Sequence, residues 1–289
     1  MSDTVEAAPD SKTVAALLPP EMALACATAG RVKAGRDAIT LLTLGILAGA
    51  FIAFGAMFMT VVLTGSGDLP WGMARLLAGL VFSLGLILVI VGGAELFTGD
   101  SLMIVACASQ RISLRALLRA WSLVYAGNVV GAVGTATLVF LAGEHEFAGG
   151  AVGKTALAIA TAKAALPLPQ LFFLAVLCNV LVCLAVWMSF GAQNATDKVA
   201  VIVPPIAAFV AAGFEHSIAN LYFLPYALLI KAAAAPAFWT AIGQDAGAYP
   251  ALTASAALYN IVVATIGNLL GGSLLVGAIY WFVYLRRRA

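Results

Sequence analysis

The stretch Gly213–Pro225, GFEHSIANLYFLP, places a glutamate and a histidine inside an apolar run that covers Val199–Ile230. A run of that length is sufficient to cross about 30 Å of hydrocarbon, which takes roughly 20 apolar residues. Ionisable side chains at membrane depth are costly and usually functional. Glu215 and His216 therefore indicate an interrupted helix, and an interruption at that depth is tolerated only where protein or a water-filled cavity satisfies its backbone.

The composition extends this interpretation to the whole chain. Of the 289 residues, 63% are hydrophobic and only 10% are charged, which excludes an ordinary water-soluble domain and indicates an integral, multi-pass membrane protein. The sequence has no basic patch of the kind that indicates a nucleic-acid partner. Six spans are predicted, two of them broken: Ala38–Leu63, Leu76–Ala94 continued by Leu102–Ala108, Ala120–Ala142, Leu171–Phe190, Val199–Ile230 and Ala254–Leu285.

The two halves of the chain share a pattern. The second span of each half is interrupted, and the third span of each half carries a G-N-x-x-G motif, GNVVG at Gly127–Gly131 and GNLLG at Gly267–Gly271. Glycines four residues apart let membrane helices approach closely. Three spans followed by three more predict an all-α fold with an inverted 3+3 repeat, in which matching broken helices indicate a substrate site near the membrane midplane.

The basic residues predict the orientation. With the N-terminus inside, eleven of the 15 lysines and arginines lie on the cytoplasmic side, so both termini are expected there. The first residues lack the basic start and apolar core of a cleaved signal. We expect a cytoplasmic segment at residues 1–36, with a short interfacial helix after Pro20, followed by a six-helix pore domain at residues 37–289.

Each interruption is expected to precede a short helix. Thr98, Asp100 and Ser101 offer capping side chains in the first break, Ala94–Ser101, and Ser217 offers one in the second break, Gly213–Ser217. Two helix N-termini then point toward the middle of the bilayer, each with unpaired amides and a partial positive charge. This arrangement favours a small anion.

His216 is the side chain in the spans that titrates near neutral pH without a large shift. We assign it the role of proton donor or electrostatic gate, with Thr98 on the facing break as its hydrogen-bond partner. The alternative is a histidine that only bonds a backbone carbonyl at a helix break. Glu215, Glu95 and Asp100 are expected to cap amides or brace the loops.

Four large apolar residues allow two interpretations. Phe82 and Leu86 share one helix face, Phe97 lies in the first break, and Phe209 lies two turns before His216. At such spacings these side chains often do no more than pack. The functional alternative makes them dry constrictions on either side of the histidine.

Several long segments resemble the formate/nitrite transporter family, in order and from about Pro20 onward. They are ELFTGDSL, GNVVGA, CNVLVCLAVWMSF, GFEHSIANLYFLP and IGNLLGGSLLVGAIYW. The resemblance implies a homopentamer of aquaporin-like protomers, each with its own pore, in a bacterial cytoplasmic (inner) membrane. It also implies roles for individual residues, and we expect Glu215 to lie beside the pore. The implied pore residues are His216, Thr98, Asn179 and Asn268. The implied constrictions are Leu86 on the cytoplasmic side and Phe82, Phe97 and Phe209 on the outer side.

The resemblance also places an anion-attracting lysine in the outer vestibule, at Lys163, 16 residues before Asn179. The alternative is that Lys163 is an ordinary solvated charge.

The leading hypothesis is a pore for small monovalent weak-acid anions, with formate slightly ahead of nitrite. Transport is expected to depend on pH and to be coupled to protons. The runner-up is an aquaporin-type channel for water or neutral solutes, although paired Asn-Pro-Ala boxes are absent from the sequence. A membrane enzyme is the third alternative. It would need a nucleophile with its base, a set of metal ligands or a cofactor motif, and the sequence indicates none of these.

Overall fold

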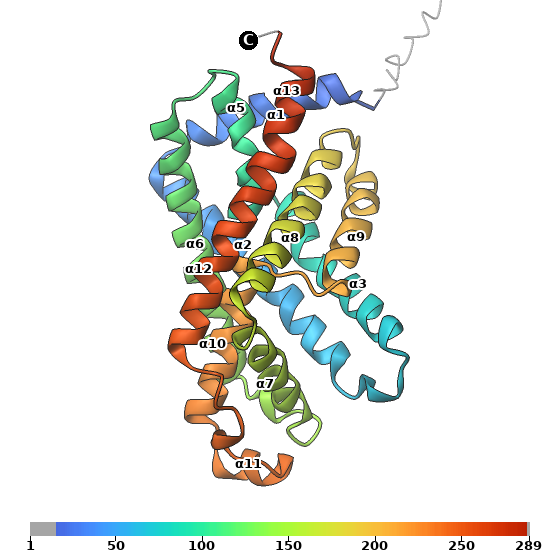
Figure 1. Cartoon of the computed structure of the whole chain (residues 1–289), viewed down its shortest axis with the longest axis vertical. Helices are drawn as coiled ribbons and strands as arrows, with labels where there is room; N and C mark the ends of the chain where they lie inside the picture. The colour runs from blue at the N-terminus through green and yellow to red at the C-terminus, as the bar shows by residue number, and fades with distance from the viewer. Residues whose placement is uncertain (1–15, 288–289) are drawn as a thin grey trace, which may run out of the picture.

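A computed structural model describes residues 16–287, and every regular element in that range is helical. Figure 1 shows an elongated bundle in which α1 lies across one end, beside α13, while α11 lies at the opposite end. The α-helices are α1 (Pro19–Ala34), α2 (Ala38–Leu63), α3 (Trp71–Gly92), α4 (Phe97–Asp100), α5 (Ile104–Ala108), α6 (Leu114–Leu141), α7 (Ala151–Ala164), α8 (Leu168–Ser189), α9 (Ala195–Ala211), α10 (Ser217–Ala233), α11 (Pro236–Ile242), α12 (Ala254–Leu270) and α13 (Ile279–Tyr284). A π-helical stretch, Gly271–Ala278, joins α12 to α13.

Five helical segments of the described chain are long and apolar enough to cross a membrane, namely α2, α3, α6, α8 and the continuous stretch Ala254–Tyr284. A sixth is reached when α10 and α11, bent by 107° to each other, are counted as one span. The predicted span Val199–Ile230 is divided between α9 and α10, of 17 residues each. The interruptions in the second and fifth predicted spans are therefore present, whereas α7 and α11 were not predicted.

Both interrupted helices end in the same way. Gly93 follows α3 with φ +82°, and Gly213 follows α9 with φ +76°. A positive φ costs little only for glycine, which explains this residue at both helix ends. The chain then continues in extended conformation through Leu96 and His216, and α4 and α10 begin directly after them.

The predicted capping of the first break is wrong. The helical turn begins at Phe97, so that Thr98 and Asp100 lie inside α4 and cannot cap it. Ser101 instead donates its hydroxyl to the Thr98 carbonyl, at 2.7 Å. The cap comes from another helix, because Asn128 Oδ1 on α6 accepts from the Phe97 N–H at 2.9 Å.

In the second break the predicted cap is also the wrong residue. His216, not Ser217, occupies the N-cap position of α10, and its Nδ1 accepts from the Ala219 N–H at 3.1 Å. The Ser217 N–H donates to Asn268 Oδ1 of α12 at 2.8 Å. The amides that were expected to remain free for a ligand are thus partly satisfied by side chains.

The asparagines of the two G-N-x-x-G motifs brace the two breaks alike. In each half the side-chain amide donates to one carbonyl in the break and to one carbonyl on the helix that starts that half. The acceptors are Gly45 O (2.8 Å) and Glu95 O (3.0 Å) for Asn128, and Ala175 O (2.7 Å) and Glu215 O (2.9 Å) for Asn268. Each break is therefore held between two long helices by one buried side chain.

The glycines of these motifs lie at close helix contacts, as predicted. A Cβ added at Gly127 would lie 2.5 Å from the Leu42 carbonyl of α2, and one added at Gly267 would lie 2.8 Å from the Phe172 carbonyl of α8. Any side chain at these positions would separate the helices. The contacts α2–α6 and α8–α12 thus fix where the bracing asparagines lie.

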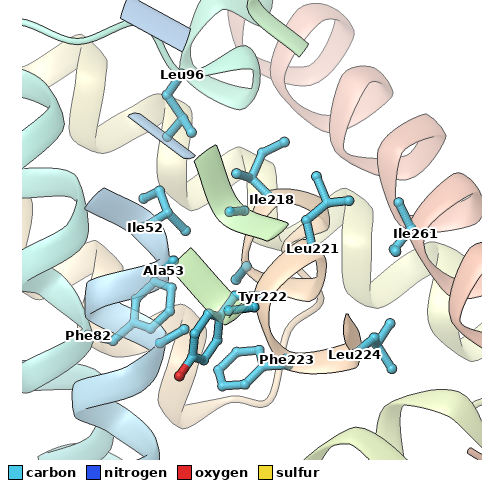
Figure 2. Packing of buried hydrophobic residues seen from close by; sticks show 14 of the residues in the cluster. Ile52, Ala53, Phe82, Leu96, Ile218, Leu221, Tyr222, Phe223, Leu224 and Ile261 are labelled. Carbon is cyan, nitrogen blue, oxygen red and sulfur yellow. The ribbon is translucent and has the colours of Figure 1, made fainter. Parts of the chain in front are cut away.

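One buried apolar cluster surrounds both breaks. Figure 2 shows Ile52 of α2, Phe82 of α3, Leu96 of the first break, Ile218 of α10 and Ile261 of α12 in this cluster. The helix starts at Phe97 and Ser217 are therefore buried among side chains from both halves of the chain. This packing positions the residues of the candidate site.

Candidate pore site

At the centre of the molecule the two breaks are joined by a side-chain hydrogen bond. Thr98 Oγ1 of α4 lies 3.0 Å from His216 Nε2, the residue that caps α10. Thr98 is fully buried and His216 is 3% exposed. Two segments 118 residues apart thus meet at one hydroxyl and one imidazole.

The contacts of the imidazole determine which nitrogen carries its proton. The Ala219 backbone N–H can only donate, so Nδ1 must accept, and the neutral ring carries its proton on Nε2. Nε2 then donates to Thr98 Oγ1. A second proton on Nδ1 would break the bond from Ala219, because a protonated imidazole has no acceptor.

Two cavities adjoin the breaks, and the larger of them lies beside the histidine. It has a volume of about 490 Å³, and its lining includes His216, Phe82, Phe209 and Lys163. The Phe82 and Phe209 rings meet edge to face with centroids 5.5 Å apart, and the Phe209 ring stacks on the imidazole at 6.0 Å. Two of the predicted outer constriction residues, Phe82 and Phe209, therefore line this cavity, and Phe209 contacts His216.

A smaller cavity, of about 260 Å³, is lined by Leu86, Leu96, Lys33, Glu95 and other residues of the first break, α1, α3, α8 and α9. The two cavities share no lining residue within the described chain. Phe82 and Leu86 are one helical turn apart on α3 but line different cavities. The barrier between the cavities therefore lies at the level of these two side chains.

Lys163 and Glu215 form an ion pair at the larger cavity, with Nζ and Oε1 2.7 Å apart. Glu215 is only 3% exposed, and its Oε2 accepts from Asn220 Nδ2 at 2.7 Å. Asn260 Nδ2 donates to the Lys163 carbonyl at 3.0 Å. Glu215 was expected to brace its loop, and it does so through side chains of α7 and α10 rather than through backbone amides.

A second cluster of ion pairs, at the smaller cavity, was not predicted. Lys33 Nζ lies 2.6 Å from oxygens of both Glu95 and Asp100, and Arg36 also pairs with Glu95. Burial lowers the pKa of the Lys33 ammonium, but the Asp100 and Glu95 carboxylates raise it by more, so the group is charged. The position of Lys33 in the chain could have indicated this cluster. Lys33 lies in the last turn of the helix that precedes α2, just as Lys163 lies in the last turn of the helix that precedes α8.

Four predicted site residues, Thr98, Asn179, Asn268 and Phe97, do not line either cavity. Asn179 Nδ2 bonds the Thr98 carbonyl at 3.1 Å and the Asn268 carbonyl at 2.7 Å, so both asparagines hold backbone. Phe97 packs against Tyr125 of α6 with ring centroids 5.0 Å apart. Asn128, which sequence reasoning did not place in the site, has the same bracing role as Asn268.

A bundle of apolar helices in which two broken segments meet between two cavities defines a membrane pore of the transport class. The chain belongs to the formate/nitrite transporter family, whose family model matches residues 20–282. It is 44% identical to the formate channel FocA of Escherichia coli strain K12, covering 93% of this chain and 95% of that one. It is 40% identical to the FocA of Haemophilus influenzae, covering 81% and 82%.

Solved structures agree with this family. A pentameric formate channel with formate bound superposes with a TM-score of 0.82 at 43% identity, covering 86% of this chain and 98% of that one. A structure described as an FNT family ion channel gives a TM-score of 0.77 at 27% identity, covering 91% and 98%. These relatives are channels and not enzymes. In residues 16–287 no group of three or more histidine, cysteine, aspartate or glutamate side chains is arranged to hold a metal ion.

Proposed function

We propose that this protein passes small monovalent weak-acid anions across a membrane, formate ahead of nitrite, with transport that depends on pH and is coupled to protons. The relatives named as formate channels support formate as the substrate. The observation that carries the mechanism is the buried contact between Thr98 and His216 beside the larger cavity. The aquaporin-type alternative is not favoured by any of these relatives.

Protonation of the anion lowers the free-energy cost of crossing the apolar barrier between the two cavities. A full charge at the centre of a bilayer costs at least about 2.5 to 3.5 kcal/mol, and a neutral acid avoids most of that cost. The His216 ring can take a second proton, delivered as hydronium from the solution that fills the larger cavity, only by giving up the Ala219 bond. The ring therefore returns readily to its neutral form by passing one proton to a carboxylate. The neutral acid then crosses the apolar constriction formed by Phe82, Phe209 and Leu86.

The remaining site residues have supporting roles in this proposal. Lys163 draws the anion toward the histidine, while Glu215 holds the lysine in place. Asn179 and Asn268 keep the two breaks in register through their backbone bonds. Phe97 contributes to the constriction by packing the first break from behind.

We further propose a homopentamer of protomers with six spans in an inverted 3+3 repeat. The pentameric relative supports the assembly, and the matching braces at the two breaks support the repeat. The charge distribution supports cytoplasmic termini, which places the larger cavity outside. The bacterial relatives support a bacterial inner membrane. Residues 1–36 form the cytoplasmic segment of this proposal, of which residues 1–15 lie outside the described range.

Formate uptake into liposomes tests this function. The purified protein is expected to take up formate faster at pH 5 than at pH 7, without a net electrical current when a proton accompanies each anion. His216→Gln should flatten this pH dependence, whereas Lys154→Gln, at an exposed position of α7 outside the cavity lining, should not. Wild-type liposomes impermeable to formate would reject the function. An unchanged pH profile in His216→Gln would reject the role of the histidine.

A further inference from the structure

Arg75, near the start of α3, lines the larger cavity and reaches the end of α9. Its Nε donates to the Ala211 carbonyl at 3.2 Å and its Nη2 donates to the Val210 carbonyl at 2.5 Å. The last carbonyls of a helix carry partial negative charge, and a cation is stabilised there. The guanidinium is thus fixed in the lining of the cavity by backbone acceptors.

These two bonds occupy only one edge of the guanidinium. The group has five N–H donors in a planar fork, of which Nε–H and one N–H of Nη2 are used on α9. Both N–H groups of Nη1 and the second N–H of Nη2 have no acceptor among the described residues. The edge formed by Nη1 and Nη2 therefore keeps the two parallel donors that match the two oxygens of a carboxylate.

The charged side chains that line the cavity leave one positive charge without an ion-pair partner, and this charge lies on Arg75. Among the described lining residues the lysine and arginine cations are Lys163 and Arg75, and the carboxylate is Glu215. Lys163 is paired with Glu215 at 2.7 Å, whereas Arg75 makes no ion pair in the described chain. Gly213 leaves room for this arrangement, since a Cβ there would lie 3.2 Å from Arg75 Nη2.

We propose that Arg75 forms a binding subsite for a planar two-oxygen anion at the mouth of the larger cavity, ahead of Lys163 and His216. Formate binds the free Nη1/Nη2 edge by two parallel hydrogen bonds, and this raises its concentration at the cavity entrance. The inference rests on the proposed function for the identity of the anion. The subsite itself follows from the guanidinium, its two backbone acceptors and the unmatched charge.

The test compares Arg75→Gln, Arg75→Lys and the control Lys154→Gln. Formate binding is measured by titration calorimetry on solubilised protein, and formate uptake is measured in liposomes, each at about 20 and about 300 mM salt. Arg75→Gln should weaken binding and raise the half-saturating formate concentration by roughly tenfold at low salt, and by much less at high salt where charges are screened. Arg75→Lys keeps the charge but loses the fork, so its effect should be intermediate. Lys154→Gln should match the wild type.

Three outcomes overturn the subsite. One is an Arg75→Gln protein that binds formate like the wild type. Another is a loss equal in Arg75→Gln and Arg75→Lys and insensitive to salt, which would show that Arg75 only braces α9. The third is an equal loss in Lys154→Gln. If the wild type binds formate through Arg75 but does not transport it, the proposed function fails while the subsite stands.

Discussion

Replacing Asn268 by alanine tests whether a single side chain holds the second break. The substitution removes the acceptor of the buried Ser217 N–H and one donor each to the Ala175 and Glu215 carbonyls. An orphaned buried N–H costs about 1 to 3 kcal/mol, and each lost bond to a carbonyl costs about 1 kcal/mol. We therefore expect Asn268→Ala to lower the free energy of unfolding by about 4 kcal/mol.

The measurement is unfolding in mixed micelles with increasing SDS, followed by far-ultraviolet circular dichroism. Thr137→Ala is the matched control, because the Thr137 hydroxyl bonds only the Val133 carbonyl in its own helix, and it should change stability by less than about 1 kcal/mol. Asn128→Ala should cost as much as Asn268→Ala, since it removes the same three kinds of bond from the first break.

Two results would refute this reasoning. If Asn268→Ala unfolds within about 1 kcal/mol of the wild type, the bonds are replaced by water or by neighbouring groups and the brace is not a determinant of the fold. If only one of the two asparagine variants is destabilised, the two breaks are not held alike. Formate uptake should fall with stability in Asn268→Ala, because His216 directly precedes the amide that Asn268 caps.

Three further perturbations have defined outcomes. Burial beside Phe140 and Phe238 lowers the pKa of His145, so this ring is neutral in the folded protein. Its contribution to the free energy of unfolding should be constant above about pH 6.5 and should fall below that pH, because only the unfolded chain takes up the proton. His145→Phe should remove this loss, measured as the difference in melting temperature between pH 7 and pH 5, and an unchanged difference would contradict the reasoning. Gly45→Val should separate α2 from α6 and lower the free energy of unfolding by more than about 3 kcal/mol, since even a Cβ at this position would lie 2.8 Å from the Val124 carbonyl. A melting temperature equal to that of the wild type would exclude this close contact. Thr98→Val should leave the imidazole Nε2–H without its acceptor and reduce formate uptake roughly tenfold, and full uptake at every pH would remove the hydroxyl from the mechanism.

Much of the fold could be predicted from the sequence because membranes restrict the possible backbones. Long apolar runs with few charges identify helices, and a glycine followed by an acidic residue inside such a run identifies a break. Both breaks lie where the sequence places them, and Gly93 and Gly213 supply the positive φ values that end the helices. The close contacts of Gly127 and Gly267 could also be predicted, since glycines four residues apart let membrane helices approach closely.

The side-chain network could be predicted only in part, because its partners are distant in sequence. Asn128 caps a helix that begins 31 residues earlier in the chain, and Lys33 pairs with Asp100 across 67 residues. A capping rule considers local side chains, so in the first break it selected Thr98 where Asn128 of a distant helix supplies the acceptor. In the second break it selected Ser217, whereas the neighbouring His216 caps α10 and Asn268 accepts from the Ser217 N–H. The helix α7, of 14 residues, is too short to be read as a span, although it carries Lys163.

The two breaks are braced alike but differ in chemistry, and that difference explains why the site holds a single imidazole. Three residues after the glycine that ends the helix, the first break has Leu96 and the second has His216. The braces bring both helix starts to the same buried region, so two histidines there would repel each other once protonated and would hinder proton transfer. With leucine on one side, the facing segment contributes Thr98 instead, a hydroxyl that accepts from Nε2 and carries no charge. Two breaks that are braced alike therefore supply the geometry, and the one position that differs between them supplies the imidazole of the proposed proton site.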